Sequence, residues 1–283
     1  MEKIPNTYVF DAESGAEMAR LIDQDRLLSR CMGGLCPEVP DLSTVHDALD
    51  VACGPGGWVQ EMAYAYPEMR VMGIDISQRM IEYAKALSQV QGLDNARFQV
   101  MDALKPLDFP DASFDLVNGR LLISFLHAGS WPVVIKELVR VLRPGGTLRL
   151  TEGDGKSITN SSAFEKFQTL MMQAFAADGR SLGPGNGHIG ITPLLGRFLQ
   201  DAGCQSVQEK AHVLNFSSGT EAHGRMYEDI KVGSKLVQPF MIRKDVVTQQ
   251  EIDQLYGQVL AEWLSEDFRG LLYLLSVWGQ KPL

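Results

Sequence analysis

Short apolar segments alternate with longer amphipathic segments between residues 46 and 153. The apolar segments predict five strands, because each is short and is followed by a turn or by a segment of helical length. They are expected at residues 48–51, 70–75, 97–101, a stretch that ends at 118–120, and 147–151. Helices are predicted from residues 58, 78 and 131. Strands that alternate with helices in this way favour a parallel sheet with helices on both faces.

The remaining segments carry further predicted elements. Residues 11–30 have helical periodicity, and this helix is expected either beside the crevice at the strand ends or only over the edge of the sheet. After residue 153 the pattern predicts helices at 160–178, 192–202, 221–237 and 248–264, and strands at 205–216 and 269–278. No internal repeat, low-complexity tract or linker is evident.

The stretch from Ala48 to Gly57 joins a strand, a glycine turn and the start of a helix. Glycine lets the backbone of such a turn approach a ligand, and a helix N-terminus favours the polar end of a nucleotide-like cofactor. The dinucleotide fingerprint G-x-G-x-x-G is incomplete, because Gly54-Pro55-Gly56 is followed by Gly57, Trp58 and Val59. Taken alone, this stretch is equally compatible with a cofactor-binding turn and with an ordinary Gly-Pro turn.

An acidic residue ends the second predicted strand, at a spacing from this turn that is typical of nucleotide-binding folds. Asp75 lies 21 residues after Gly54, about where nucleotide-binding folds place the carboxylate that binds the ribose hydroxyls. Ser77 is expected to cap the following helix. The sequence therefore predicts a ribose site at Asp75.

Composition narrows the class of partner. The 283 residues have a formal net charge of -9, which disfavours a nucleic-acid binder and an electrostatic membrane anchor. Residues 1–14 have no signal-peptide pattern, and no run of about 18 apolar residues is present. The four cysteines form no C-x-x-C pair and have no histidine at zinc-ligand spacing. We therefore expect reduced thiols, no metal site, no membrane segment and a cytoplasmic location.

Residues 46–153 resemble the class I S-adenosylmethionine-dependent methyltransferases, motif by motif and in order. The resemblance rests on five segments: DxACGPG from Asp50, GIDIS..MI.YA from Gly73, DA at 102–103, FPDASFD from Phe109, and ELVRVLRPGG from Glu137. Each is weak alone, but together they are specific. They are most similar to the small-molecule branch, which includes quinone-biosynthesis C-methyltransferases and antibiotic-tailoring O- and N-methyltransferases. The departure is Ala52, where the family usually has its first glycine.

The resemblance implies a Rossmann-like α/β fold with a mostly parallel seven-stranded sheet and an antiparallel last strand. Residues 1–45 would form an N-terminal helical cover, and residues 46–283 the methyltransferase domain. Within that domain, 46–153 would be the cofactor-binding core, and 154–283 would complete the sheet and add helices on the acceptor side.

The same resemblance implies which residues bind S-adenosyl-L-methionine. The glycine turn would hold the methionine end, Asp75 the ribose and Asp102-Ala103 the adenine, and Tyr8 would close over the cofactor. The full expected set is Tyr8, Asp50, Ala52, Gly54, Gly56, Asp75, Ile76, Met80, Asp102, Ala103, Asn118 and Arg120.

Catalytic residues are harder to predict, because orientation contributes about 7–11 kcal/mol and a general base only ~10²–10⁴-fold, or roughly 3–5 kcal/mol. His127 is the first candidate base, since it follows the fourth strand; His188, in the glycine-rich segment 179–190, would need a closing lid. A structural or solvated role for each histidine stays open. Glu152 and Asp154 could bind a cationic acceptor amine or join a metal.

The expected function is therefore methyl transfer to a small, partly apolar acceptor of secondary or quinone-like metabolism, by a monomer or homodimer. Asn118-Gly119-Arg120-Leu121 lacks the Asn/Asp-Pro-Pro-Tyr/Phe motif of enzymes that methylate nucleic-acid bases or protein glutamines. One alternative uses the same fold and cofactor for a non-methylating lyase or cyclase reaction. Another is an NAD-dependent oxidoreductase. For the helix at 160–178, core packing of its Phe/Met face is preferred over a role in an acceptor pocket.

Overall fold

The computed structural model describes residues 7–39, 41–184 and 187–283, so the first six residues of the expected N-terminal cover lie outside it. The described residues form one eight-stranded sheet in the order β3-β2-β1-β4-β5-β8-β6, with β7 paired to β8. The strands are β1 Asp47–Val51, β2 Arg70–Asp75, β3 Ala96–Val100, β4 Phe114–Arg120, β5 Leu142–Glu152, β6 Ile158–Thr159, β7 Gln205–Asn215 and β8 Gly270–Gln280.

The five strands β1 to β5 are parallel, whereas β8 runs antiparallel to both β5 and β7. This confirms the Rossmann-like α/β fold with an antiparallel last strand. The expected count of seven strands misses β6, whose two residues pair with β8 beyond the end of β5. A two-residue strand is too short to produce a recognisable apolar pattern. The expected division at residue 45 stays a prediction.

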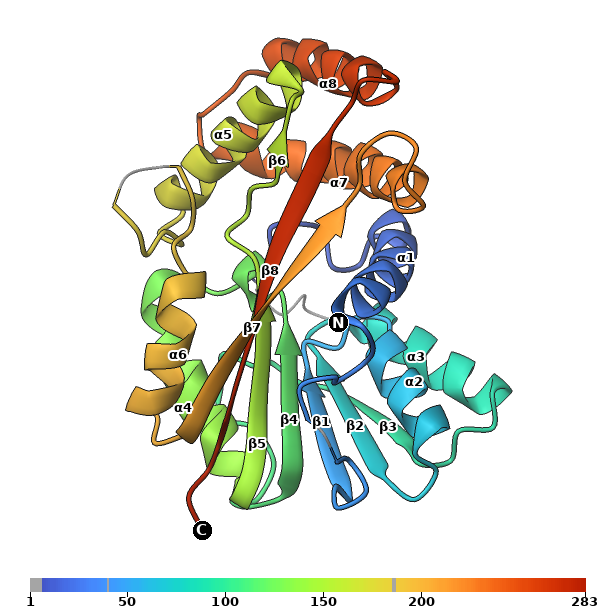
Figure 1. Cartoon of the computed structure of the whole chain (residues 1–283), viewed down its shortest axis with the longest axis vertical. Helices are drawn as coiled ribbons and strands as arrows, with labels where there is room; N and C mark the ends of the chain where they lie inside the picture. Colours follow the sequence, from blue (N-terminus) through green and yellow to red (C-terminus); the bar gives the residue numbers. More distant parts are fainter. Residues whose placement is uncertain (1–6, 40, 185–186) are drawn as a thin grey trace.

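Helices cover both faces of the sheet and its carboxyl edge (Figure 1). They are α1 Gly15–Met32, α2 Gly57–Ala65, α3 Gln78–Val90, α4 Trp131–Val141, α5 Ser162–Ala177, α6 Thr192–Asp201, α7 His223–Arg243 and α8 Gln249–Trp263, with 3-10 turns η1 Leu122–Ser124 and η2 Ala128–Ser130. In Figure 1, α5, α7 and α8 lie above the carboxyl ends of the strands, and α1 lies beside α7. No helix in these ranges is both long and apolar enough to cross a bilayer.

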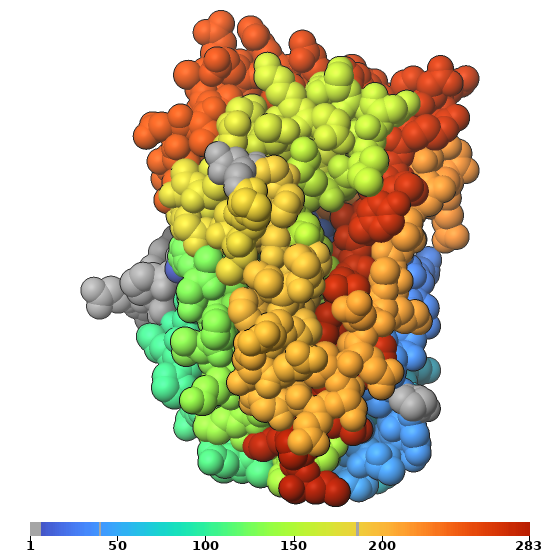
Figure 2. Space-filling model, turned by 60° about the vertical axis from the view of Figure 1, so that its left-hand side comes forward, coloured from blue at the N-terminus to red at the C-terminus, as the bar shows by residue number. Residues whose placement is uncertain are grey.

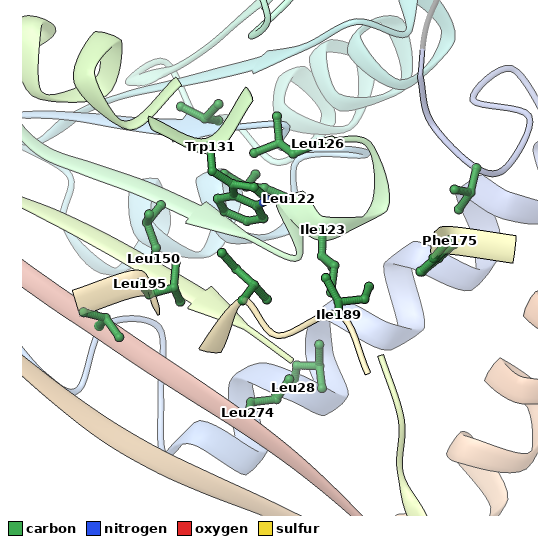
Figure 3. Packing of buried hydrophobic residues seen from close by; sticks show 14 of the residues in the cluster. Leu28, Leu122, Ile123, Leu126, Trp131, Leu150, Phe175, Ile189, Leu195 and Leu274 are labelled. Carbon is green, nitrogen blue, oxygen red and sulfur yellow. The ribbon is translucent and has the colours of Figure 1, made fainter. Parts of the chain in front are cut away.

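Alternation along the strands divides the core into two clusters. In β1, Ala48 faces the cluster under α2 and α3, while Leu49 faces the larger cluster that contains α4. Figure 3 shows part of the larger cluster, with Trp131 of α4, Leu150 of β5 and Leu274 of β8. By contrast, β7 is exposed over most of its length, and Figure 2 shows it at the surface beside β8.

Ser77 has the structural effect that the sequence predicts for it. The Ser77 hydroxyl caps α3 by accepting a hydrogen bond from the Met80 N–H at 3.1 Å. The same hydroxyl lies 3.0 Å from the Ala12 carbonyl, to which it can donate. The cap therefore also ties the segment before α1 to the end of β2.

Gly56 explains the close contact between α2 and the sheet. Its φ of +83° is left-handed, and a Cβ there would stand 2.6 Å from Phe98 Cε1 and 2.9 Å from the Ala84 methyl group. The glycine therefore satisfies both a backbone and a packing requirement.

We predict that Gly56→Ala lowers the free energy of unfolding by about 3 kcal/mol or more, because a left-handed alanine costs ~1–2 kcal/mol and overpacking adds ~1–3 kcal/mol. Gly92→Ala is the matched control: its φ is +68°, but nothing lies within 4 Å of the added Cβ. It should cost only the backbone term, about 1 kcal/mol. Equal losses for both variants in urea unfolding would show that the contact with Phe98 is unimportant.

Candidate functional site

A cavity of about 360 Å³ lies at the carboxyl ends of β1, β2 and β4, and α1, α5 and α7 contribute to its wall. It brings together ten of the fourteen residues expected in the site. They are Tyr8, Asp50, Ala52, Gly54, Asp75, Ile76, Met80, Asp102, Ala103 and Arg120. Leu21, Gln24 and Leu28 also line it, so α1 lies beside the crevice, the first of the two positions considered for it.

Asp75 is anchored by the glycine turn on one side and by α3 on the other. Asp75 Oδ2 accepts a hydrogen bond from the Gly54 N–H, and Asp75 Oδ1 one from the Ser77 N–H, each at 2.9 Å. Burial raises the pKa of Asp75, although these N–H groups oppose the shift. The carboxyl group therefore has a fixed orientation at the end of β2.

The segment after β3 forms a second polar corner of the cavity. Asp102 Oδ1 accepts a hydrogen bond from the Leu104 N–H at 3.0 Å, which holds the turn after the strand. Met80 and Met101 line the cavity with Ala103. A flat apolar group with a polar edge fits such a combination of walls.

Asp50 and Arg120 supply charge at the ends of β1 and β4. Asp50 is only 3% exposed and accepts a hydrogen bond from Asn118 Nδ2 at 2.7 Å. Burial raises its pKa to about 7, which the positive charge of Arg120 partly opposes. Arg120 forms an ion pair with Asp25 of α1 and donates a hydrogen bond to the Ser29 hydroxyl at 3.2 Å.

Ala52 has a left-handed backbone, with φ of +56°. This conformation costs a non-glycine residue about 1–2 kcal/mol, which explains why glycine suits this position of the turn. The Cys53 N–H donates to the Ile74 carbonyl at 2.9 Å and so connects the turn to β2. The alanine is accommodated, and it lines the cavity.

Four of the expected residues do not line the cavity. Gly56 lies behind the turn, packed against Phe98, and Asn118 is fully buried, where it holds Asp50. His127 turns away, with its Nε2 3.3 Å from Asp178 Oδ2. The His188 ring lies against Gly183 in the loop before α6. These four residues therefore lie outside the lining of the cavity, and their roles in the site stay predictions.

The carboxylates of Glu152 and Asp154 are bound to other groups of the protein. Glu152 is fully buried and accepts hydrogen bonds from the N–H groups of Leu122 at 2.6 Å and Ile123 at 3.4 Å. Asp154 accepts from the N–H of Ile191 at 2.9 Å and from the Thr192 hydroxyl at 2.7 Å, at the start of α6. Both carboxylates accept hydrogen bonds that hold loops of the protein, and neither residue lines the cavity. They are therefore not available for a cationic amine. The described ranges contain no group of three or more His, Cys, Asp or Glu suited to a metal.

The second half of the cavity is mostly apolar, and α5 and α7 supply much of it. Phe164, Phe167 and Met171 of α5 line the cavity together with Ile230 and Val237 of α7. Phe164 and Phe167 belong to the main core as well, so the preference for core packing alone is incomplete. The spacing of these residues along α5 indicates a buried face but cannot distinguish a core from a cavity wall.

A buried charge cluster connects α1 with α7 at the edge of this half. Arg20 binds Glu17 through Nε and Nη2, each at 2.7 Å, and Asp229 through Nη1 at 2.8 Å. Tyr8 donates its hydroxyl proton to Glu17 at 2.5 Å, and burial raises the pKa of this tyrosine well above its usual value. The pairing of Arg20 with Asp229 spans 209 residues, which no local pattern could indicate.

Comparison with known proteins agrees with this arrangement. Residues 48–146 match a family described as a methyltransferase domain. A demethylmenaquinone methyltransferase of Geobacillus stearothermophilus is 36% identical over 100 residues, which cover 35% of this chain and 42% of that protein. The methyltransferase GfsG of Streptomyces halstedii is 34% identical over 116 residues, 40% of this chain and 39% of that protein. The matches thus span less than half of these relatives.

Solved structures resemble a larger part of the chain. Phosphoethanolamine N-methyltransferase 2 of Haemonchus contortus, in complex with S-adenosyl-L-methionine, gives a TM-score of 0.53 at 18% identity, over 90% of this chain and 52% of that one. The [4+2]-cyclase SpnF gives 0.51 at 19% identity over 100% of both chains. At such identities these likenesses show the fold.

Fold and site together define an α/β protein with a cofactor cavity at the carboxyl edge of its sheet. The region that carries the glycine turn, Asp75 and Asp102 belongs to the class I S-adenosylmethionine-dependent methyltransferase family.

The raised pKa of Asp50 predicts a specific pH dependence of stability. An unfolded aspartate titrates near 3.9, so between about pH 4 and pH 7 the folded protein binds a proton at Asp50 that the unfolded chain does not. This group's contribution to stability therefore falls as the pH rises through that window and is constant above it. Asp50→Asn removes the titration and keeps an oxygen for Asn118.

As the pH rises from 5.5 to 8, the wild type without ligand should lose about 2 kcal/mol of unfolding free energy through Asp50. Asp50→Asn should not show this loss, so its stability relative to the wild type should increase by the same amount. Urea unfolding at several pH values measures this difference. Parallel curves for the two proteins would contradict the assignment of the titration to Asp50.

Proposed function

We propose that the protein transfers the methyl group of S-adenosyl-L-methionine to a small, partly apolar molecule. The observation that carries the proposal is one cavity with two unlike halves. The glycine turn and the acids at the carboxyl ends of β1, β2 and β3 line the part formed by the strand ends, and aromatic and aliphatic side chains of α5 and α7 line the part that these helices cover. Such a division suits a polar cofactor beside an apolar acceptor.

The residues of the first half fit the cofactor. In this proposal Asp75, already oriented by two N–H groups, accepts the ribose hydroxyls, and Asp102 and Ala103 contact the adenine. The Gly54 side of the turn receives the amino-acid end, because a Cβ on Gly54 would meet only Leu21 at 3.6 Å. When bound, S-adenosyl-L-methionine supplies an electrophilic methyl group on a sulfonium that leaves as a neutral thioether.

The chain's main contribution to rate is orientation and exclusion of water. Phe164, Phe167 and Met171 form a rigid apolar surface, because they also pack into the core around α5. Holding an acceptor in line with the methyl group in this way is worth about 7–11 kcal/mol. The side chains of α1 and α7 cover the same space from the other side.

No general base stands out in the described part of the cavity wall. None of the five histidines lines it, and all five acids that do already accept hydrogen bonds or ion pairs: Asp25, Asp50, Asp75, Asp102 and Asp229. The catalytic roles of His127 and His188 stay predictions without support from their positions. We propose that orientation dominates the reaction.

A cavity without an evident base is equally compatible with a second candidate, a lyase or cyclase reaction that needs only positioning. The fold occurs in a [4+2]-cyclase, whose structure was compared above. Mass spectrometry of the product separates the candidates: methylation adds one methyl group to the acceptor and releases S-adenosylhomocysteine, and the alternative does neither.

We further propose a cytoplasmic protein that acts on a free small molecule, as a monomer or homodimer. The acidic net charge of -9 and the four free cysteines support this proposal. An NAD-dependent oxidoreductase is less compatible, because the turn lacks the third glycine of the dinucleotide fingerprint.

The proposal predicts that the purified protein binds S-adenosylmethionine and S-adenosylhomocysteine, but not NAD(H), in titration calorimetry. Asp75→Ala should weaken binding of both sulfur compounds at least about tenfold, because it removes a charged hydrogen-bond acceptor worth ~1.5–3 kcal/mol. Asp94→Ala, at an exposed position far from the cavity, is the control and should have no effect. Unchanged affinity in Asp75→Ala would exclude the ribose role.

A further inference from the structure

The buried cluster that joins α1 to α7 contains one more carboxylate than cations. Arg20 pairs with Glu17 at 2.7 Å and with Asp229 at 2.8 Å. In the ranges that the structure describes, no other salt bridge reaches either carboxylate. Tyr8 donates a hydrogen bond to Glu17 but stays neutral, because burial raises the pKa of this tyrosine well above its usual value. The cluster therefore carries one uncompensated negative charge.

This charge reaches the cavity through Asp229. Glu17 is fully buried and does not line the cavity, whereas Asp229 lines it and has a side chain that is 11% exposed. Arg20 binds Asp229 Oδ1, while Oδ2 accepts a hydrogen bond from Gln24 Nε2 at 3.4 Å, which is long for such a bond. Burial raises the pKa of Asp229, and the charge of Arg20 opposes the shift. One oxygen of this carboxylate is thus weakly bound.

The same helix presents a second polar group to the cavity. The residues of α7 that line the cavity recur at the spacing of one helical face: Asp229, Ile230, Gly233, Ser234 and Val237. Ser234 is 4% exposed, and its hydroxyl makes no hydrogen bond to another residue in the described part of the chain. A buried hydroxyl without a partner is unfavourable. Ser234 therefore points independently to a polar group of a bound molecule at this wall.

The rest of this part of the wall is apolar. Phe164, Phe167 and Met171 of α5 line the cavity opposite the strand ends, and Ile230 and Val237 of α7 add aliphatic surface. A molecule that fits must therefore combine a hydrocarbon body with a polar end. The excess of negative charge at Asp229 favours a polar end that is positively charged.

We propose that Asp229 anchors a protonated amino group of the methyl acceptor. The inference rests on the proposed function and names the chemical class of its acceptor, a partly apolar amine. The ammonium group supplies the positive charge that the cluster lacks, at a partly buried place where an unpaired charge is strongly unfavourable. A protonated amine has no lone pair with which to attack the methyl group. This group therefore holds the acceptor, and another of its atoms receives the methyl group.

The test uses small amines and their alcohols as probes, on the protein saturated with S-adenosylhomocysteine. Benzylamine, phenethylamine and phenylpropylamine carry an ammonium group at increasing distances from an apolar ring, and benzyl alcohol, phenethyl alcohol and phenylpropanol are their neutral counterparts. Ligand-detected NMR titration at neutral pH gives each affinity. At least one amine should bind about ten- to a hundredfold more tightly than its alcohol, the range for a charged hydrogen bond.

Asp229→Asn should abolish this preference, because it removes the charge and keeps an oxygen for Arg20. Glu228→Gln is the matched control: it removes the same charge from the preceding residue of α7, which is exposed and pairs with Lys231, so the preference should stay. Glu17→Gln balances the cluster from outside the cavity wall. It should lower the preference at least about threefold, and it provides the test if Asp229→Asn does not fold.

A different use of the same charge, pairing with the sulfonium of the cofactor, has its own signature. Asp229→Asn would then weaken S-adenosylmethionine about tenfold more than S-adenosylhomocysteine in titration calorimetry. The inference predicts instead that the ratio of these two affinities changes by less than about twofold.

The inference is overturned if no amine binds more tightly than its alcohol, if Asp229→Asn keeps the preference, if Glu228→Gln loses it equally, or if the charge proves to serve the sulfonium. If the wild type binds neither sulfur compound, the proposed function itself fails. That result differs from a failure at Asp229 alone.

Discussion

A carboxyl group buried at the end of the central strand is the constraint on which the site depends. Asp50 lies under the glycine turn and is held by Asn118, which in turn accepts a hydrogen bond from Arg149 at 2.8 Å. Arg149 is fully buried and pairs with Glu38, which also lies 3.1 Å from His212. Buried polar groups are stable only with such partners, so this network joins β1, β4, β5 and β7 behind the cavity.

Hydrogen bonds within the protein hold the acids on both sides of the turn. Asp50 is fixed from behind by Asn118, and Asp75 is fixed by the backbone N–H groups of Gly54 and Ser77. The two acids therefore define the floor of the cavity on either side of the turn. We propose that the acceptor is selected by the part of the cavity wall that α5 and α7 form.

Sequence reasoning succeeded where a pattern is local. The strand ends, the Ser77 cap and the spacing from Gly54 to Asp75 depend on residues close along the chain, and all three appear in the structure. It did not find Asp25 or Asp229, because their arginine partners lie 95 and 209 residues away. Ion pairs between elements far apart along the chain leave no periodicity in the sequence.

The sequence also did not predict the direction in which some polar side chains point. Glu152 is the last residue of β5, where it was expected just past the strand, and it is directed at the N–H groups of the turn after β4. His127 follows β4 but pairs with Asp178, which also binds Arg180 and Lys244. In both cases topology predicted the location of the residue, while competing hydrogen-bond partners determined where its polar atoms point.

The most direct test of the account is a crystal structure of the protein grown with S-adenosylhomocysteine. The account predicts density for the ligand in the cavity, with the ribose hydroxyls on the Asp75 carboxylate and the adenine beside Asp102 and Ala103. A ligand bound elsewhere, or one in the cavity whose ribose does not contact Asp75, would contradict it.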